Sequence, residues 1–217
     1  MKNLFILFLL SAFFLVSSCK KVDLNSDIGG SQSPIGEVGN TVDLRAGQFG
    51  IEETNIYVSK LENGVSTFVC SGIATDSYYI DLLKMVPSHH IPGTVNIDGN
   101  NVEITINAKV TDEGGQVVFN DGSKFTLVKY DAKVGDKYTV EVNGNTLVNE
   151  VVNVSTDDDF FWGGMYIKVI TVKSSSSLPG ISYVEHYYNH KFGLVGLAIY
   201  FEDGSVKYAG IDCGVKK

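Results

Sequence analysis

Val102-Glu103-Ile104-Thr105-Ile106-Asn107-Ala108-Lys109-Val110 is the stretch of sequence that decides the fold class. Apolar and polar side chains alternate along it without interruption. A strict period of two places the apolar side chains on one face of a strand and the polar ones on the other, as in an antiparallel sheet with one wet face. This segment therefore predicts a strand over 102–110 with its even-numbered residues buried.

Tight turns punctuate the rest of the chain. Asn-Gly and Asp-Gly pairs tolerate the positive φ angles of two-residue hairpin turns, and each such pair here lies between strand-forming residues. They are Asn63-Gly64, Asp98-Gly99, Asp121-Gly122, Asn143-Gly144 and Asp203-Gly204. We expect further strands near 54–61, 65–73, 116–120, 124–130, 138–142, 147–152, 164–173, 181–188, 194–201 and 205–211.

One segment departs from this pattern. Asp76 is placed to cap a helix over 77–86, with apolar residues at helical spacing and Pro87 as its stop. The predicted fold is mainly β, either an antiparallel sandwich or a curled sheet of hairpins, with one short helix. A boundary near 130–133 would divide it into two β subdomains.

The N-terminus has the layout of an export signal at 1–18, with Lys2 followed by an apolar run from Leu4 to Val16. That run is shorter than the ~20 residues that span a bilayer as a helix. Leu15-Val16-Ser17-Ser18-Cys19 resembles the lipobox of bacterial lipoproteins. The resemblance implies a lipid thioether on Cys19, cleavage before it, and acylation of the new terminus, by palmitate for example. A plain signal peptide with a chance cysteine is the alternative.

Residues 19–39 are polar and rich in glycine and serine, which predicts a flexible tether ahead of a β-rich domain over 40–217. Lys20, directly after the cysteine, favours the outer membrane over the inner one in proteobacterial lipoproteins. Because Lys20-Lys21-Val22-Asp23 is a poor match to the acidic cluster of surface-directed Bacteroidota lipoproteins, we expect the periplasmic side of the outer membrane.

The second half of the domain carries three loose motifs. They are VGDKY from Val134, WGGMY from Trp162 and FGLV from Phe192. Together they resemble a C-terminal module of small Bacteroidota lipoproteins of unknown function. The resemblance implies an antiparallel β fold and supplies no reaction or ligand.

Composition limits the partners and the redox chemistry. The formal net charge is −8, and a net acidic chain without a basic block is not expected to bind nucleic acid. Its first predicted partner is the lipid bilayer, through Cys19. In an oxidising compartment, Cys70 and Cys213 could form a disulfide or stay as two buried thiols.

Catalytic signatures are missing from the sequence, which has no Gly-x-Ser-x-Gly elbow, His-Glu-x-x-His or phosphate loop. The sequence thus predicts no catalytic residue, metal site or cofactor. His186 and His190 have the spacing of helical zinc ligands, but on a strand four residues span about 13 Å. His89 and His90 are expected on a loop.

The most suggestive stretch for a ligand is Asp157-Asp158-Asp159-Phe160-Phe161-Trp162. Acidic residues beside aromatics suit a calcium loop or a platform for sugar rings. The same residues also suit a β core with a solvated turn. From this stretch, the candidate ligand loop consists of Asp157, Asp158, Asp159, Phe160 and Trp162.

Three functions remain open. The first is a non-catalytic membrane-anchored β module that binds a protein or glycan partner in the envelope. The second is a hydrolase acting on an envelope or glycan substrate, which would be favoured if Asp157–Asp159 met a histidine pair in one pocket. The third is a surface glycan-binding lipoprotein that serves an outer-membrane importer, which requires an exposed Trp162.

Overall fold

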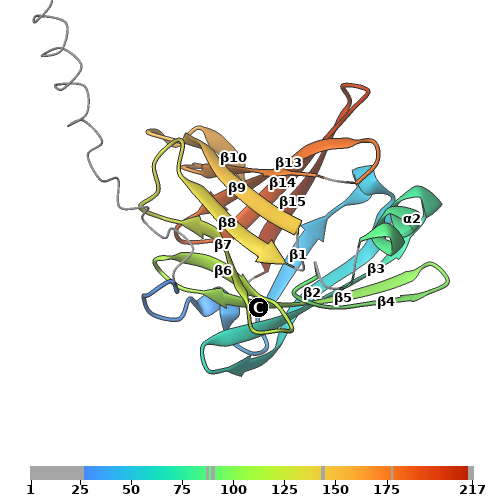
Figure 1. Cartoon of the computed structure of the whole chain (residues 1–217), viewed down its shortest axis with the longest axis horizontal. Coiled ribbons are helices and arrows are strands. Elements are labelled where there is room, and N and C mark those ends of the chain that lie inside the picture. The colour runs from blue at the N-terminus through green and yellow to red at the C-terminus, as the bar shows by residue number, and fades with distance from the viewer. Residues whose placement is uncertain (1–26, 87, 89–90, 143–144, 177, 215–217) are drawn as a thin grey trace, which may run out of the picture.

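The structure is a computed structural model that describes residues 27–86, 88, 91–142, 145–176 and 178–214. It confirms a mainly β fold, because one antiparallel sheet of 13 strands curls until its two edges nearly meet (Figure 1). The strands of this sheet are β1 (Thr41–Arg45), β2 (Ile51–Glu62), β3 (Val65–Ala74), β4 (Gly93–Asp98), β5 (Asn101–Val110), β6 (Gly114–Val118), β7 (Lys124–Lys129), β8 (Lys137–Val142), β9 (Asn145–Val154), β12 (Ile170–Ser175), β13 (Ile181–Asn189), β14 (Gly193–Phe201) and β15 (Val206–Gly214).

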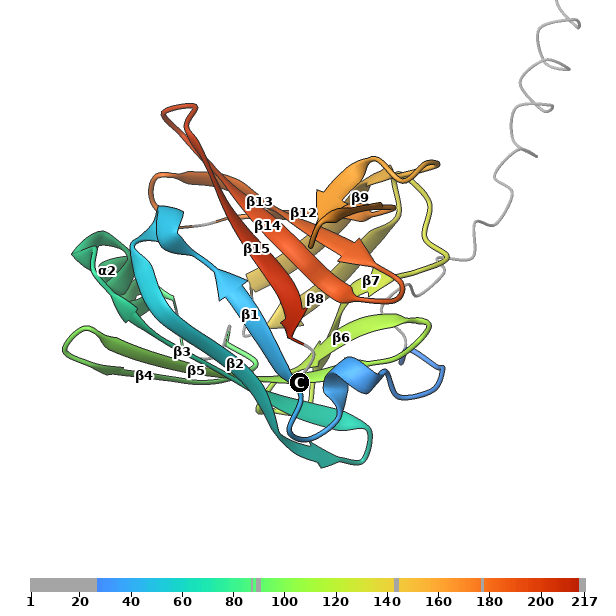
Figure 2. The same ribbon diagram turned by 180° about the vertical axis from the view of Figure 1, so that it is seen from behind.

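The strand order divides the sheet into two sequence halves. It runs β7-β6-β5-β3-β2-β1 and then β15-β14-β13-β12-β9-β8, with β4 paired to β5 beside β6. The halves are joined where β1 pairs with β15, as Figure 2 shows from behind. The two edge strands, β7 and β8, are consecutive in the chain, and residues 130–133 connect them. The predicted boundary therefore falls where the chain crosses from one edge of the sheet to the other.

Both halves bury a common core. The strand that decided the fold class contributes as predicted, since Ile106, Ala108 and Val110 of β5 pack inward. From the second half, Tyr138 of β8 is 1% exposed in the same cluster. Its hydroxyl accepts a hydrogen bond from the Lys129 N–H of β7 at 3.3 Å, so Tyr138 links the two edges of the curled sheet.

The turn pairs define hairpins as predicted. Asn63 and Gly64 have φ angles of 51° and 74°, the left-handed values that a tight turn between β2 and β3 requires. Asn143-Gly144 lies outside the described residues. Three strands were missed: β1, β4 and β10 (Phe160–Trp162). The strand expected over 164–173 is interrupted at Lys168 and Val169, which separate β11 (Met165–Ile167) from β12.

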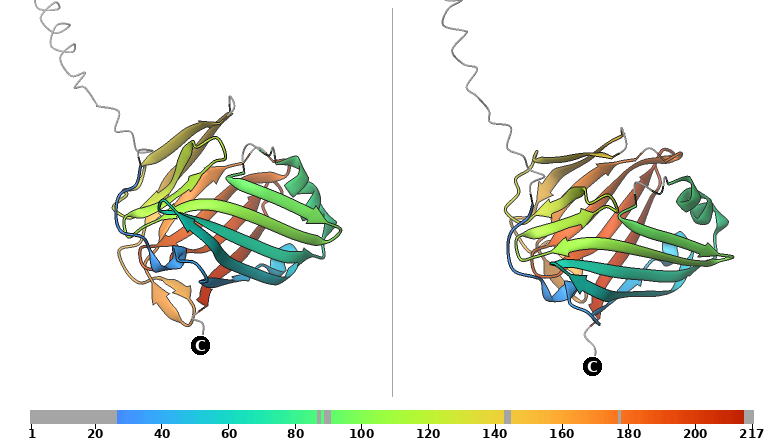
Figure 3. Two further views of the ribbon diagram at one scale, coloured as in Figure 1. Left: turned by 90° about the horizontal axis from the view of Figure 1, so that it is seen from below. Right: turned by 60° about the horizontal axis from the view of Figure 1, so that its bottom comes forward.

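The predicted helix is confirmed as α2 (Ser77–Met85), where the Asp76 carboxylate accepts a hydrogen bond from the Tyr78 N–H at 3.0 Å. It lies at one end of the curled sheet, between the strands of the first half and those of the second (Figure 3). Tyr79 and Leu82 point into the sheet and pack with Phe49, which belongs to the short helix η3 (Gly47–Phe49). Within the described part of the chain, no helix is long and apolar enough to cross a membrane.

The tether is shorter than predicted, because residues 28–39 pack on the sheet. Ile28 is 3% exposed, and its carbonyl accepts a hydrogen bond from Lys109 Nζ at 2.5 Å. Gln32 forms an isolated antiparallel β-bridge with Thr111, and the short helix η2 (Pro34–Gly36) follows. Composition alone suggested a linker, whereas one buried isoleucine and several backbone hydrogen bonds hold the segment in place. Only 19–26 of the predicted tether lie outside the described residues.

Candidate functional site

The predicted ligand loop leads into a separate two-stranded hairpin, β10 (Phe160–Trp162) with β11. This hairpin lies on the outer face of the curled sheet, over β13, β14 and β15. Trp162 Nε1 donates a hydrogen bond to the Ile211 carbonyl of β15 at 2.7 Å, and the ring of Phe160 lies 5.0 Å from that of Tyr187 on β13.

Trp162 is not an exposed platform. Its side chain is 7% exposed and packs with Ile167, Val169 and Val195 in a small core beneath the hairpin. The reason is the period of two along a strand: Phe160 and Trp162 share the face that meets the sheet, and Phe161 takes the other. Phe161 and Tyr166 are 64% and 63% exposed, with their rings edge to face at 5.3 Å. The exposed Trp162 that the importer alternative predicts is therefore not observed, and this side chain fits the β-core interpretation instead.

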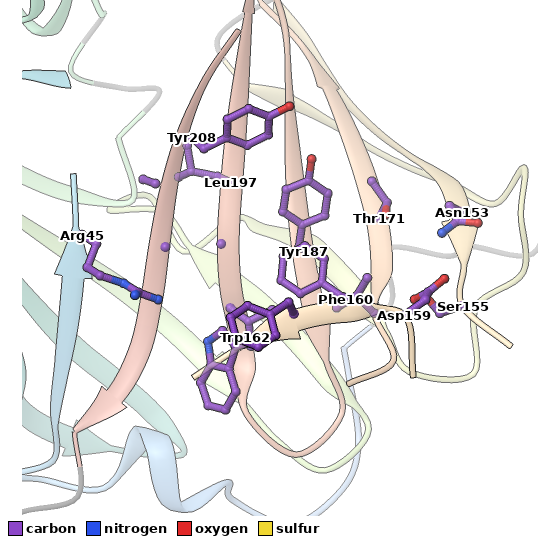
Figure 4. Close-up of a pocket in the computed structure, with 16 residues that line it drawn as sticks. Arg45, Asn153, Ser155, Asp159, Phe160, Trp162, Thr171, Tyr187, Leu197 and Tyr208 are labelled. Atoms are coloured by element: carbon purple, nitrogen blue, oxygen red, sulfur yellow. The ribbon is translucent and has the colours of Figure 1, made fainter. Parts of the chain in front are cut away.

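The strands beneath the hairpin form a row of four paired residues on this outer face. Arg45 of β1 pairs with Gly210 of β15, Gly210 pairs with Gly196 of β14, and Gly196 pairs with Tyr187 of β13. The two middle positions have no side chain. A hollow consequently opens between the Tyr187 ring and the Arg45 guanidinium, and the hairpin forms one wall of it (Figure 4).

The hollow is a pocket of about 420 Å³, within the size range of small-molecule sites. Aromatic rings from Phe160, Trp162, Tyr187 and Tyr208 line it together with polar groups. At the end opposite Arg45 lie Asn153, Ser155 and Asp159, as Figure 4 shows.

Contacts with neighbouring groups orient the polar side chains of the pocket. Arg45 Nη2 lies 2.8 Å from one carboxylate oxygen of Asp212 and 3.0 Å from the other. The Ser155 hydroxyl donates to Asp159 Oδ1 at 2.8 Å. The pocket thus holds a cation at one end and a carboxylate at the other.

A carboxylate beside the pocket organises the tyrosines of this face. Glu185 Oε2 accepts hydrogen bonds from the hydroxyls of Tyr187 at 3.1 Å and Tyr200 at 3.0 Å. Burial and the neighbouring Glu185 charge raise the pKa of both phenols, that of Tyr200 to about 12. Tyr183 stacks on Tyr200 at 4.3 Å between ring centroids. Tyr187 and Tyr200 therefore stay protonated at neutral pH and present hydroxyl groups without phenolate charge.

The structure brings together some of the predicted loop residues and not others. Asp159, Phe160 and Trp162 line the pocket, whereas Asp157 and Asp158 are exposed and do not. Five further lining residues were not predicted from the sequence: Arg45, Gly196, Gly210, Tyr187 and Tyr208. These come from four different strands, and only the pairing register brings them side by side.

The two histidines that the structure describes, His186 and His190, do not line this pocket. His186 points from β13 to the inner face of the sheet, and His190 lies in an exposed turn after it. His89 and His90 lie outside the described residues. Among the residues that the structure describes, no three His, Cys, Asp or Glu side chains gather as metal ligands would.

Cys70 is a free thiol in the structure. Its strand partner is Ile56, which pairs with Val42, which in turn pairs with Cys213. Three strand spacings of about 4.8 Å separate the two cysteine backbones, and a disulfide needs Cα atoms within about 7 Å. The Cys213 side chain lies outside the described residues. This register favours the free-thiol alternative.

No protein-family model matches the chain, and no curated protein matches its sequence. One solved structure is similar to it. That structure belongs to a Bacteroides fragilis protein that is proposed to be exported and has a YmcC-like fold. The identity is 12% and the TM-score 0.45, over 87% of this chain and 100% of the other.

Proposed function

We propose that this protein is an envelope lipoprotein that binds a glycan, without catalysis, in the pocket beside the β10–β11 hairpin. The observation that carries the proposal is the row Arg45–Gly210–Gly196–Tyr187, in which two paired glycines leave a floor without side chains. The protein would be anchored through Cys19 to the outer membrane, with the domain on the periplasmic side.

The chemistry of the pocket matches a sugar better than a charged or purely apolar ligand. A pyranose ring has apolar C–H faces, which pack on aromatic rings such as those of Tyr187 and Tyr208. Its edge carries hydroxyl groups, which need donors and acceptors together. Arg45 supplies donors, Asp159 supplies acceptors and Asn153 supplies both. Phe161 also lines the pocket, and its exposed ring together with that of Tyr166 extends the aromatic surface outward.

The hydrolase alternative has less support. A meeting of the aspartates of 157–159 with a histidine pair would favour it, but among the described residues of these groups only Asp159 lines the pocket. His186 points to the opposite face of the sheet. The importer alternative calls for an exposed Trp162, which is buried here, and it differs further in placing the domain on the cell surface. Protease treatment of intact cells separates the two, because only a surface domain is degraded.

Filling the pocket floor tests the proposal. A Cβ at Gly210 meets only the Arg45 side chain, at 3.3 Å, so Gly210→Val should fold while occupying the hollow. We expect it to weaken glycan binding by at least about tenfold, the equivalent of ~1.4 kcal/mol, in calorimetric titrations. Gly47→Val is the matched control, because a Cβ there meets nothing within 4 Å. Equal glycan affinity of both variants would place the binding elsewhere.

Anchoring is tested separately. Cys19→Ala should either release the protein from the membrane fraction or leave an uncleaved precursor, since the lipid supplies the membrane affinity. Cell fractionation and the mass of the protein measure this. Normal processing together with unchanged membrane attachment would contradict lipidation at Cys19 and leave the glycan proposal untouched.

A further inference from the structure

The interior of the curled sheet is only partly filled. At the end where α2 lies, a cavity of about 290 Å³ separates the helix from the inner face of the sheet. It extends from β1, β2, β3 and β5 on one side to β13, β14 and β15 on the other. Its lining includes Phe49, Leu82, Ile104, Leu178 and Ile199.

The cavity is a break in otherwise continuous core packing. Along β5, the inward side chains of Ile106 and Ala108 belong to the packed core, whereas Val102 and Ile104 line the cavity. Leu44, Ile51, Leu197 and Ile199 also point inward and stay only half-buried. Protein cores are normally packed as tightly as organic crystals. An apolar space of this size is therefore fit to hold an apolar guest.

The lining dictates the chemistry of that guest. The polar groups among the lining residues are the side chains of Thr54 and Ser71, the thiol of Cys70 and the hydroxyl of Tyr79, and no charged side chain of the described residues contributes. A sugar or peptide placed there would lose hydrogen bonds to water without replacing them, whereas hydrocarbon would gain from burial. At roughly 30 Å³ for each methylene, about the share of one water molecule in the liquid, the cavity holds about ten of them.

A second hollow adjoins the first at the C-terminal end of α2. It has a volume of about 300 Å³, and Leu83 and Val86 line both spaces. Leu83 and Val86 therefore lie between the two hollows, and a rotation of their side chains would join them. Lys84 lines the outer hollow, and its ammonium group lies 3.8 Å from the Asp81 carboxylate. The route out of the apolar interior thus passes a cation on the last turn of the helix.

We propose that the interior binds one long acyl chain, with the chain end under α2 and an anionic head beside Lys84. This site is separate from the glycan pocket, because it lies on the inner face of the sheet. A free fatty acid and the acyl chain of an anionic membrane lipid have the same recognised chemistry.

Palmitate binding to the full-length protein carrying Cys19→Ala tests the proposal, since this variant has no attached lipid of its own. Native mass spectrometry should show one palmitate per chain. Ile104→Trp fills the cavity and should weaken palmitate binding by at least about a hundredfold, the effect of displacing three or four methylenes. Val134→Trp, at a site 63% exposed, is the matched control. Equal palmitate affinity of the two variants overturns the proposal.

The head group is tested with lysine variants. Lys84→Gln should weaken binding of palmitate and leave that of uncharged hexadecanol unchanged, while Lys60→Gln, on the exposed part of β2, should change neither. If the protein binds palmitate but not lysophosphatidylglycerol, the ligand is a free fatty acid. If it binds both, the ligand can be the acyl chain of a membrane lipid. Loading with neither overturns the proposal.

A measurement without a core substitution covers the case in which Ile104→Trp does not fold. The Cys70 thiol lines the cavity, and burial raises its pKa to about 11. Saturating palmitate should slow the alkylation of Cys70 by N-ethylmaleimide at alkaline pH. Peptide mass mapping measures how much of Cys70 has reacted at each time. An unchanged rate at Cys70 contradicts occupation of the cavity. Glycan binding by Ile104→Trp should persist, which separates this proposal from the first.

Discussion

Tyr138→Ala should lower the free energy of unfolding by about 3–5 kcal/mol, the usual cost of removing a buried aromatic ring. The Tyr138 side chain is 1% exposed within the common core, and its hydroxyl accepts from the Lys129 N–H on the opposite edge of the sheet. The substitution therefore removes packing and loosens the contact between β7 and β8. Denaturant unfolding followed by circular dichroism measures the loss.

Two variants calibrate this result. Tyr138→Phe keeps the ring and should cost only about 1 kcal/mol, for the lost hydrogen bond. Tyr166→Ala, at a side chain 63% exposed, should cost at most about 1 kcal/mol. A small effect of Tyr138→Ala, or separate unfolding of the two sequence halves, would contradict a single sheet closed around a common core.

Acid should destabilise the protein between pH 6.5 and about 4 through His186. Burial lowers the pKa of this imidazole from 6.5 to about 4, although the Val172 carbonyl acts in the opposite direction. Between pH 6.5 and about 4, His186 is protonated in the unfolded chain but stays neutral in the folded chain. The free energy of unfolding therefore decreases as the pH falls through this range and levels off below about pH 4. The loss over this window is on the order of 3 kcal/mol.

The surroundings of His186 explain why the charged form is excluded. It lies on the inner face with Ser174, whose hydroxyl is 3.4 Å from Nδ1 and donates to Asn149. Burial of the imidazole among these groups leaves its charged form poorly hydrated. Urea titrations at several pH values measure the effect, and His186→Gln should remove most of the slope between pH 6.5 and 4.

An equal slope in the His186→Gln variant would assign the acid sensitivity to other groups. The carboxylates of Asp27, Asp121 and Asp203 have pKa values lowered below 3.8 by hydrogen bonds to Lys124, Ser123 and Ser205 respectively. Their stabilising contribution is lost only at lower pH, so the two windows can be distinguished.

Local pattern was sufficient to predict most of the sheet. The alternation over 102–110, the turn residues at Asn63-Gly64 and the cap at Asp76 each act within a few residues, and the structure confirms all three. β1, β4 and β10 were missed because they are short, so that any alternation in them extends over only a few residues. The packed segment after Ile28 has the composition of a linker, and only its tertiary contacts reveal its place.

The site was harder to predict than the fold. Aromatics near Asp159 identified one wall of the pocket, but the side of a three-residue strand that faces the sheet is not evident from Phe160, Phe161 and Trp162 alone. The floor depends on the register of β1, β15, β14 and β13, which pair across most of the length of the chain. Two glycines in separate strands look like ordinary strand glycines until that register brings them together.

The most direct test of the central claim, glycan binding in the outer pocket, is an array of bacterial-envelope and host glycans probed with the wild-type protein and with Gly210→Val. We predict that the wild-type protein is retained by a defined subset of glycans and that Gly210→Val is retained by none of them. Absence of wild-type binding across the array, or identical binding by Gly210→Val, would contradict the account.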